Sequence, residues 1–205
     1  VNGIRAAVRR GFADWLATRD CDLVALQEVR APSDLVPPEA LAGYHYCYHP
    51  GDRAGRNGVA LLDGGKIAAV RFKHELPNYG TFDEVRLFEP GPLPEPIVFK
   101  GVMIGLPICE DIWHPDVCRH LADFGAELLI CVNGSPYEID KDTLRIDGVA
   151  KRRAVDTGLP LAYVNRVGGQ DELVFDGGSF VVNGDGKLAV QLADWEEREV
   201  RTHWT

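Results

Sequence analysis

The sequence predicts an α/β fold in which buried strands alternate with helices. Two successive strand–turn–helix units carry this prediction. In the first, an apolar run at 102–108 ends at Cys109 and precedes a helix at about 115–124. In the second, an apolar run at 128–132 precedes a helix at about 143–157. Short strands that are apolar throughout are typical of sheets covered by helices, so we expect a layered α/β arrangement.

Further elements are predicted on both sides of this central part. Apolar residues at three- and four-residue steps predict a first helix at about 4–18, whereas the stretches at 31–41 and 82–96, which contain proline, predict loops. The remaining predictions are strands at 22–27, 44–49, 57–62, 66–72 and 161–165, and a hairpin at 178–192. A chain of 205 residues can bury one sizeable core, so we expect a single domain over 1–205.

The composition indicates an acidic protein with reduced thiols. Its five cysteines are an odd number without close pairs, which favours free thiols over a disulfide framework. The net charge is −9, and residues 1–62 hold seven basic and seven acidic residues, so the whole excess lies in 63–205. An acidic protein is a poor match for a polyphosphate backbone, so nucleic acid is not an expected partner. Without a membrane-length apolar stretch or a signal-like segment, we expect a soluble, cytoplasmic protein with no membrane partner.

Cys109 is the first candidate for chemistry. It lies where a buried strand is predicted to turn sharply, and backbone N–H groups at such a turn can lower the pKa of a thiol and bind a developing oxyanion. A cysteine that ends a buried strand is often simply a small core residue. This position alone therefore does not establish an enzyme.

Four ordered motifs strengthen the enzymatic interpretation. They are LPICEDIW at 106–113, RFKHELPNYG at 71–80 with FDE at 82–84, NGSPYE at 133–138, and YVNRVGGQDELVFDG at 163–177. The first resembles the nucleophile segment of the nitrilase superfamily. Together the four resemble the glutaminase domain of glutamine-dependent NAD synthetases, and the resemblance extends from about Asp63 to Thr205.

This resemblance implies a carbon–nitrogen hydrolase that releases ammonia from glutamine through a cysteine thioester. Cys109 would attack the side-chain amide, and Lys73 would stabilise the oxyanion together with the backbone N–H of Glu110. A glutamate would act as general base and then as general acid. Tyr79, Glu110 and Ser135 would contact the glutamine head group.

The first third of the chain resembles a different family. Its motifs are VNGIRAAVRRGF at 1–12, LQEVR at 26–30 and HPGDRAGRNGVAL at 49–61. They resemble exonuclease III-type AP endonucleases, in which the residues matching Asn2 and Glu28 lie at a magnesium-dependent phosphodiester site. The sequence thus indicates a chimera or a fragment with a family seam near 57–63.

Glu28 is the predicted general base. Both families form a four-layer α-β-β-α sandwich, so we expect that fold class despite the seam. In nitrilases the catalytic glutamate ends the strand after the first helix, which is the place that Glu28 occupies here. The alternative is an exposed carboxylate at a strand end.

Two other functions stay open: a magnesium-dependent AP endonuclease or exonuclease, and an inactive chimera. The Asp-x-Asn pair and the C-terminal Ser-Asp-His of the endonucleases have no counterpart here. His45, Cys47 and His49 alternate on one predicted strand, but three ligands on a straight strand rarely converge, so we expect no metal.

The expected partners follow from the resemblance. Glutamine is the expected substrate, and no cofactor is expected. The chain has no phosphate-binding glycine loop, so the ATP-dependent NAD synthetase domain that the resemblance implies would be separate. An assembly of identical chains is compatible with the sequence.

Overall fold

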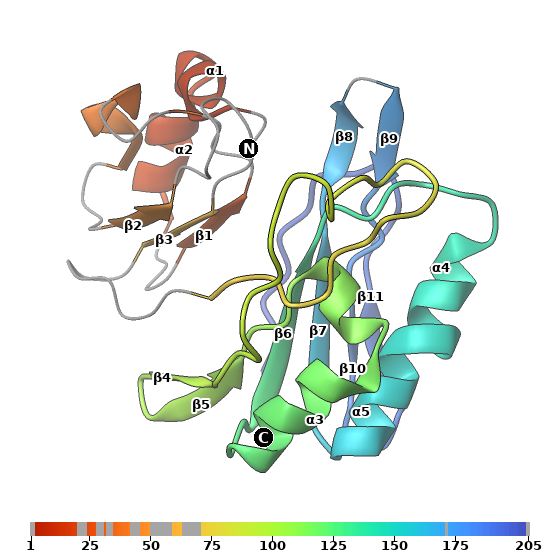
Figure 1. Ribbon diagram of the computed structural model, residues 1–205. Coiled ribbons are helices and arrows are strands. Elements are labelled where there is room, and N and C mark those ends of the chain that lie inside the picture. Colours follow the sequence, from red (N-terminus) through yellow and green to blue (C-terminus); the bar gives the residue numbers. More distant parts are fainter. Residues whose placement is uncertain are drawn as a thin grey trace. The chain divides into compact units, whose positions relative to one another are not determined.

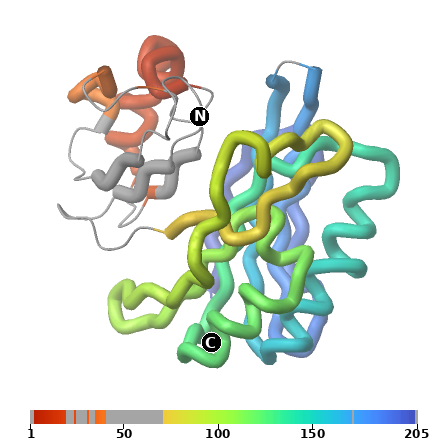
Figure 2. Tube along the Cα trace, in the orientation of Figure 1, coloured from red at the N-terminus to blue at the C-terminus, as the bar shows by residue number. Residues whose placement is uncertain are grey.

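The computed structural model divides the chain into two compact units, Val1–Val70 and Arg71–Thr205. Figures 1 and 2 trace both along the sequence. The structure describes residues 3–19, 24–27, 31, 35–41, 46–49, 59–62, 71–170 and 172–203. The prediction that the whole chain forms one domain with a seam near 57–63 stays a prediction.

The first unit contains short helices and a three-stranded antiparallel sheet. Its elements are α1 (Ile4–Arg9), α2 (Phe12–Ala17), β1 (Val24–Gln27), η2 (Pro38–Leu41), β2 (Tyr46–His49) and β3 (Val59–Leu62), and the strand order is β1-β3-β2. The single helix predicted at 4–18 is wrong in detail, because it breaks at Gly11, whose φ is +88°. Ile4 and Leu16 are nevertheless buried together with Ala40, as the predicted apolar stripe requires.

The second unit is built on a six-stranded mixed sheet. Its strands are β4 (Ile97–Phe99), β5 (Val102–Gly105), β6 (Leu128–Asn133), β7 (Leu161–Asn165), β10 (Phe180–Val182) and β11 (Leu188–Gln191), in the order β11-β10-β7-β6-β5-β4. Strands β5, β6 and β7 are parallel. Their carboxyl ends therefore meet at one edge of the sheet, which is where α/β proteins place functional groups.

Helices cover one face of this sheet (Figure 1). Helix α3 (Pro115–Asp123) buries Val117, Cys118 and Leu121 on one side. A continuous helical stretch follows β6: α4 (Lys141–Thr143), a wide π-type segment η4 (Leu144–Ala150) and α5 (Lys151–Thr157). Apolar residues of α3, η4, α5 and the sheet form one buried cluster. This cluster fixes the strands whose ends carry the candidate site.

The sequence predictions missed two hairpins. One joins β4 to β5, and the other pairs β8 (Val167–Gln170) with β9 (Leu173–Asp176). The glycines in β8 remove the alternation that identifies a strand. Residues 66–70 of the strand predicted at 66–72 lie outside the described residues, and 71–72 belong to no strand. The predicted loop at 82–96 is confirmed. None of the described helices is long and apolar enough to cross a membrane.

Candidate active site

Cys109 lies at a sharp turn after β5. Ile108 is still extended and bridges to Val132 of β6, and the 3₁₀ helix η3 (Cys109–Ile112) begins at the next residue. The φ of Cys109 is +50°, a conformation that costs a non-glycine residue roughly 1–2 kcal/mol. Strained backbone of this kind clusters at functional sites. The backbone N–H of Gly134, at the end of β6, donates a hydrogen bond to the sulfur.

The Lys73 ammonium acts electrostatically on this thiol. The ammonium is held by both carboxylate oxygens of Glu84, with Nζ–Oε distances of 2.9 and 2.7 Å. Both side chains are largely buried, at 16% and 26% exposure. The ammonium lowers the pKa of the Cys109 thiol.

The environment of the thiol favours its neutral form. Burial raises the pKa of Cys109, and it outweighs the opposing effects of the Lys73 ammonium and the Gly134 N–H. The carboxylates of Glu84 and Glu110 raise the same pKa further. A thiol in this state needs a base to remove its proton during attack.

We therefore expect alkylation of Cys109 by iodoacetamide to have a pH midpoint above that of free cysteine. The thiolate is the reactive form, so the rate should rise with pH through the raised pKa. Mass spectrometry of the Cys109 peptide after timed labelling measures this profile. A midpoint at or below that of free cysteine would contradict the predicted burial effect.

Gly91 holds the lysine segment in place. Its N–H donates to the carbonyl of Lys73 at 2.9 Å, and its own carbonyl lies 2.7 Å from His74 Nδ1. A methyl group on Gly91 would lie only 2.5 Å from Cβ of Phe72 and 3.2 Å from the carbonyl oxygen of Lys73. These contacts leave no room for a side chain.

Gly91→Ala should thus displace the lysine segment and destabilise the protein by about 1–3 kcal/mol. Urea denaturation measures the loss. Gly169→Ala is the matched control, because the nearest atom to an added methyl there is 3.7 Å away. Equal stability of the two variants would show that the close approach at Gly91 is not a constraint.

Glu110, the residue after Cys109, pairs with Tyr79. The Tyr79 hydroxyl lies 3.0 and 2.9 Å from the two oxygens of Glu110, and His114 Nε2 lies 3.9 Å from one of them. Burial raises the pKa of Glu110, opposed by the Tyr79 hydrogen bond and the Lys73 charge. Burial and the neighbouring Glu110 raise the pKa of Tyr79. The pair presents a carboxylate and a half-exposed aromatic ring near the nucleophile.

Ser135 is buried in a polar network behind the site. Its N–H donates to Asn165 Oδ1 at 3.0 Å, and its hydroxyl accepts from Arg145 Nε at 3.1 Å. Arg145 Nη2 also donates to the carbonyls of Ser135 and Pro136, at 2.9 and 2.8 Å. These contacts fix the turn that carries Gly134. The predicted contact of Ser135 with the glutamine head group stays a prediction.

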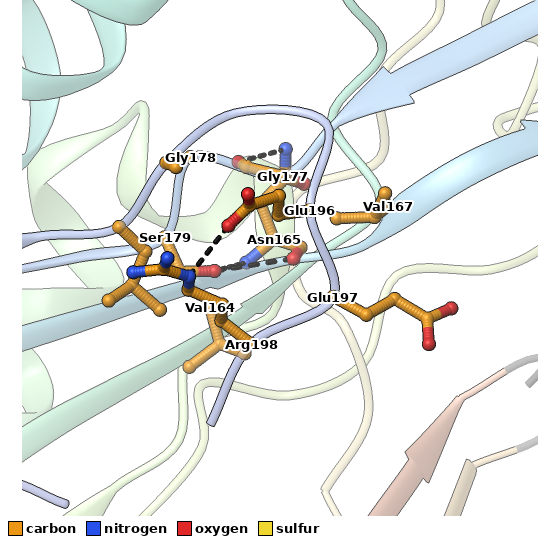
Figure 3. A pocket seen from close by; sticks show the side chains of 11 residues that line it. Val164, Asn165, Val167, Gly177, Gly178, Ser179, Glu196, Glu197 and Arg198 are labelled. Atoms are coloured by element: carbon orange, nitrogen blue, oxygen red, sulfur yellow. Dashed lines mark hydrogen bonds and ion pairs between the residues drawn. The ribbon is translucent and has the colours of Figure 1, made fainter. Parts of the chain in front are cut away.

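A separate hollow of about 230 Å³ lies between β7 and the C-terminal segment (Figure 3). Asn165 and Ser179 line one side, and Glu196 and Arg198, which pair with each other at 2.6 Å, line the other. None of the predicted reaction residues lines it. The hollow therefore does not belong to the chemistry at Cys109.

Comparison with known proteins agrees with this geometry. The profile of the carbon-nitrogen hydrolase family matches residues 37–203, which is most of the chain. The chain belongs to the carbon-nitrogen hydrolase family.

Among the proteins similar to this carbon-nitrogen hydrolase are glutamine-dependent NAD synthetases. The chain is 51% identical over 140 residues to a glutamine-dependent NAD(+) synthetase of Rhodobacter capsulatus, covering 68% of this chain and 25% of that protein. The structure of glutamine-dependent NAD+ synthetase from Acinetobacter baumannii aligns with a TM-score of 0.68 and 31% identity, covering 95% of this chain and 33% of that one. The chain spans about a quarter of the length of such curated relatives.

The structural neighbours also confirm the nitrilase-like α/β fold. A mutant amidase of the nitrilase superfamily from Nesterenkonia aligns with a TM-score of 0.51 and 33% identity, covering 59% of this chain and 44% of that one. The comparisons do not support the endonuclease resemblance of residues 1–62. The hydrolase profile begins at residue 37, ahead of the predicted seam at 57–63, and the NAD+ synthetase structure aligns with nearly the whole chain.

The structure links several of the predicted hydrolase residues. The charges of Lys73 and Glu110 act on the Cys109 thiol, the Tyr79 hydroxyl binds Glu110, and Ser135 lies in the turn after β6. The roles of these residues in the reaction stay predictions. Glu28 lies outside the described residues, so its role as the base stays a prediction.

Two further predictions rest on residues that the structure does not describe. Asn2 and His45 are outside the described residues, as are the side chains of Cys47 and His49. The interpretations of the residues at 45–49 and of the endonuclease-like metal residues therefore stay predictions.

Glu84 is the residue that sequence reasoning missed. It was part of the FDE motif at 82–84, but the motif alone gave it no role. Its pairing with Lys73 spans 11 residues of loop and depends on how that loop folds. A carboxylate within a family motif next to the lysine segment is the signal that could have found it.

Proposed function

We propose that this hydrolase domain releases ammonia from glutamine, as the glutaminase part of a glutamine-dependent NAD synthetase. The observation that supports the proposal is that Cys109 follows β5 at the carboxyl edge of parallel strands, where the Lys73 ammonium acts on its thiol. The glutamine-dependent NAD(+) synthetases among its relatives support the choice of substrate.

The proposed reaction begins with attack of the Cys109 sulfur on the side-chain amide carbon. A carbon–sulfur bond forms, and a glutamate takes the thiol proton and passes it to the departing amine. Lys73 and the N–H of Glu110 stabilise the oxyanion. Ammonia leaves, and water then attacks the thioester, so that glutamine and water become glutamate and ammonia.

Glu28 remains the proposed base. Within the described part of the chain, Glu84 and Glu110 are two carboxylates whose charges act on the thiol. Glu84 is already committed to Lys73 through both oxygens, and Glu110 accepts from Tyr79. Both are therefore better suited to hold neighbours in place than to shuttle a proton.

Glu110 and Tyr79 are proposed to receive the amino-acid head group. The Glu110 carboxylate is buried beside the nucleophile, and it would pair with the ammonium of free glutamine. An amide without that ammonium would lack the contact. The ammonia is proposed to serve an ATP-dependent synthetase domain, as the names of the relatives suggest.

The test uses the full chain with glutamine and with a glutamine-like diazoketone. We expect ammonia release that Cys109→Ala abolishes, and selective labelling of Cys109 over the buried Cys118 and Cys131. Equal labelling of the three thiols, without ammonia release, would support an inactive chimera. Magnesium-dependent cleavage of abasic DNA that Glu28→Ala abolishes would support the endonuclease alternative.

A further inference from the structure

The segment that carries Lys73 has no regular secondary structure of its own. Residues 71–96 contain neither helix nor strand, and Figure 2 shows them as a looping trace. The sheet therefore does not place the Lys73 ammonium in the way that β5 and β6 place Cys109 and Gly134. Gly91 and Glu84 hold Lys73 within the loop, so the placement of the ammonium relative to the thiol depends on contacts that tie the loop to the strands.

Asp111 supplies those contacts. One of its oxygens, Oδ1, accepts the backbone N–H of His74 at 3.0 Å and that of Glu75 at 2.8 Å. The other, Oδ2, accepts the N–H of Ile108 at 2.8 Å. The carboxylate thus links the residue after Lys73 to the residue before Cys109.

The surroundings of Asp111 exclude a direct role in the chemistry. The residue is fully buried, and both of its oxygens are engaged by backbone donors. Burial raises the pKa of Asp111, while the three N–H groups and the Lys73 charge oppose that effect. Its hydrogen bonds thus join two backbone segments.

We propose that Asp111 is a positioning residue that fixes the Lys73 ammonium opposite the Cys109 thiol. This inference rests on the proposed function, and it adds the carboxylate that aligns the Lys73 ammonium with the Cys109 thiol. A carboxylate is required because both oxygens must accept hydrogen bonds at once. An amide of the same shape has one accepting oxygen, so it can serve the lysine segment or Ile108 but not both.

The isosteric variant Asp111→Asn tests this role in the full chain. We expect the iodoacetamide midpoint of Cys109 to move upward, because the displaced ammonium no longer stabilises the thiolate. We also expect kcat for glutamine to fall about 100-fold, the effect that a small misplacement of a reacting group can have. Asp83→Asn is the matched control in the same loop, since that exposed carboxylate pairs with Arg86.

The double variant Lys73→Met with Asp111→Asn distinguishes an effect on the position of the ammonium from a general destabilisation of the site. Lys73→Met should also raise the Cys109 midpoint, and Asp111→Asn in that background should raise it no further, because the ammonium is already gone. An unchanged midpoint in Asp111→Asn would overturn the proposal. So would a double variant whose shift is the sum of the two single shifts.

Two features keep the test decisive. Alkylation needs no glutamine, so a midpoint shift in a chain that does not hydrolyse glutamine would refute the proposed function and leave the positioning role intact. If Asp111→Asn does not fold, hydrogen exchange of the unmodified chain replaces it. The amides of His74 and Glu75 should be protected, and exchange at the rate of an unfolded peptide would overturn the proposal.

Discussion

Lys73→Met should reduce glutamine hydrolysis to roughly a thousandth of the rate of the unmodified chain. Methionine keeps much of the length and the apolar stem of lysine, so the loss would come from the missing ammonium. Without that cation the tetrahedral oxyanion loses a donor, and the Glu84 carboxylate is left largely buried without its partner. Steady-state ammonia release with glutamine measures the effect as a loss in kcat.

Lys151→Met is the control for this substitution. Lys151 also pairs with a carboxylate, that of Asp147, but it lies on α5 and has no part in the candidate site. We expect its activity to match that of the unmodified chain. If Lys73→Met kept activity within tenfold of this control, the ammonium would not be the group that stabilises the oxyanion.

The main elements of the second unit could be predicted because their apolar residues follow simple periods. Strand β7 has the predicted bounds, and α3 differs from its prediction by one residue at its end. The β8–β9 hairpin could not be found this way, because the strand containing Gly168 and Gly169 has no apolar face. The wide turn at Leu144–Ala150 also leaves no trace in the apolar pattern.

Some residues of the candidate site could be predicted from the sequence and others could not. Cys109 and Lys73 were identified from family motifs, and the sharp turn at Cys109 from its place after an apolar strand. Glu84 and Asp111 could not be assigned roles, because each acts through a contact with another part of the chain. Such pairs depend on tertiary packing that no local pattern records.

Arg145 is the clearest case of a residue whose place in the structure the sequence pattern did not indicate. An arginine on a predicted helix is expected to face solvent, yet Arg145 is 2% exposed. Its guanidinium lies 2.7 Å from Asp176 and donates to two carbonyls of the turn after β6. The π-type segment η4 carries it, and such segments are frequent at functional sites.

Arg145→Met should destabilise the protein by about 3–5 kcal/mol, because it leaves the buried Asp176 carboxylate without its cation. Activity should fall with it, since the turn that Arg145 holds carries the Gly134 N–H that contacts the Cys109 sulfur. Urea denaturation of the full chain measures the first effect. Arg152→Met, an exposed arginine on α5, should change the free energy of unfolding by less than about 0.5 kcal/mol.

Removing both charges distinguishes the ion pair from simple loss of packing. If the cost of Arg145→Met comes from an uncompensated carboxylate, then Asp176→Asn added to it should recover part of the stability. If it comes from the lost side-chain volume, the two changes should add. Recovery of stability without recovery of activity is the expected result. Asparagine at position 176 leaves no buried charge, but the carbonyls of Ser135 and Pro136 still lack the donor that Arg145 supplied.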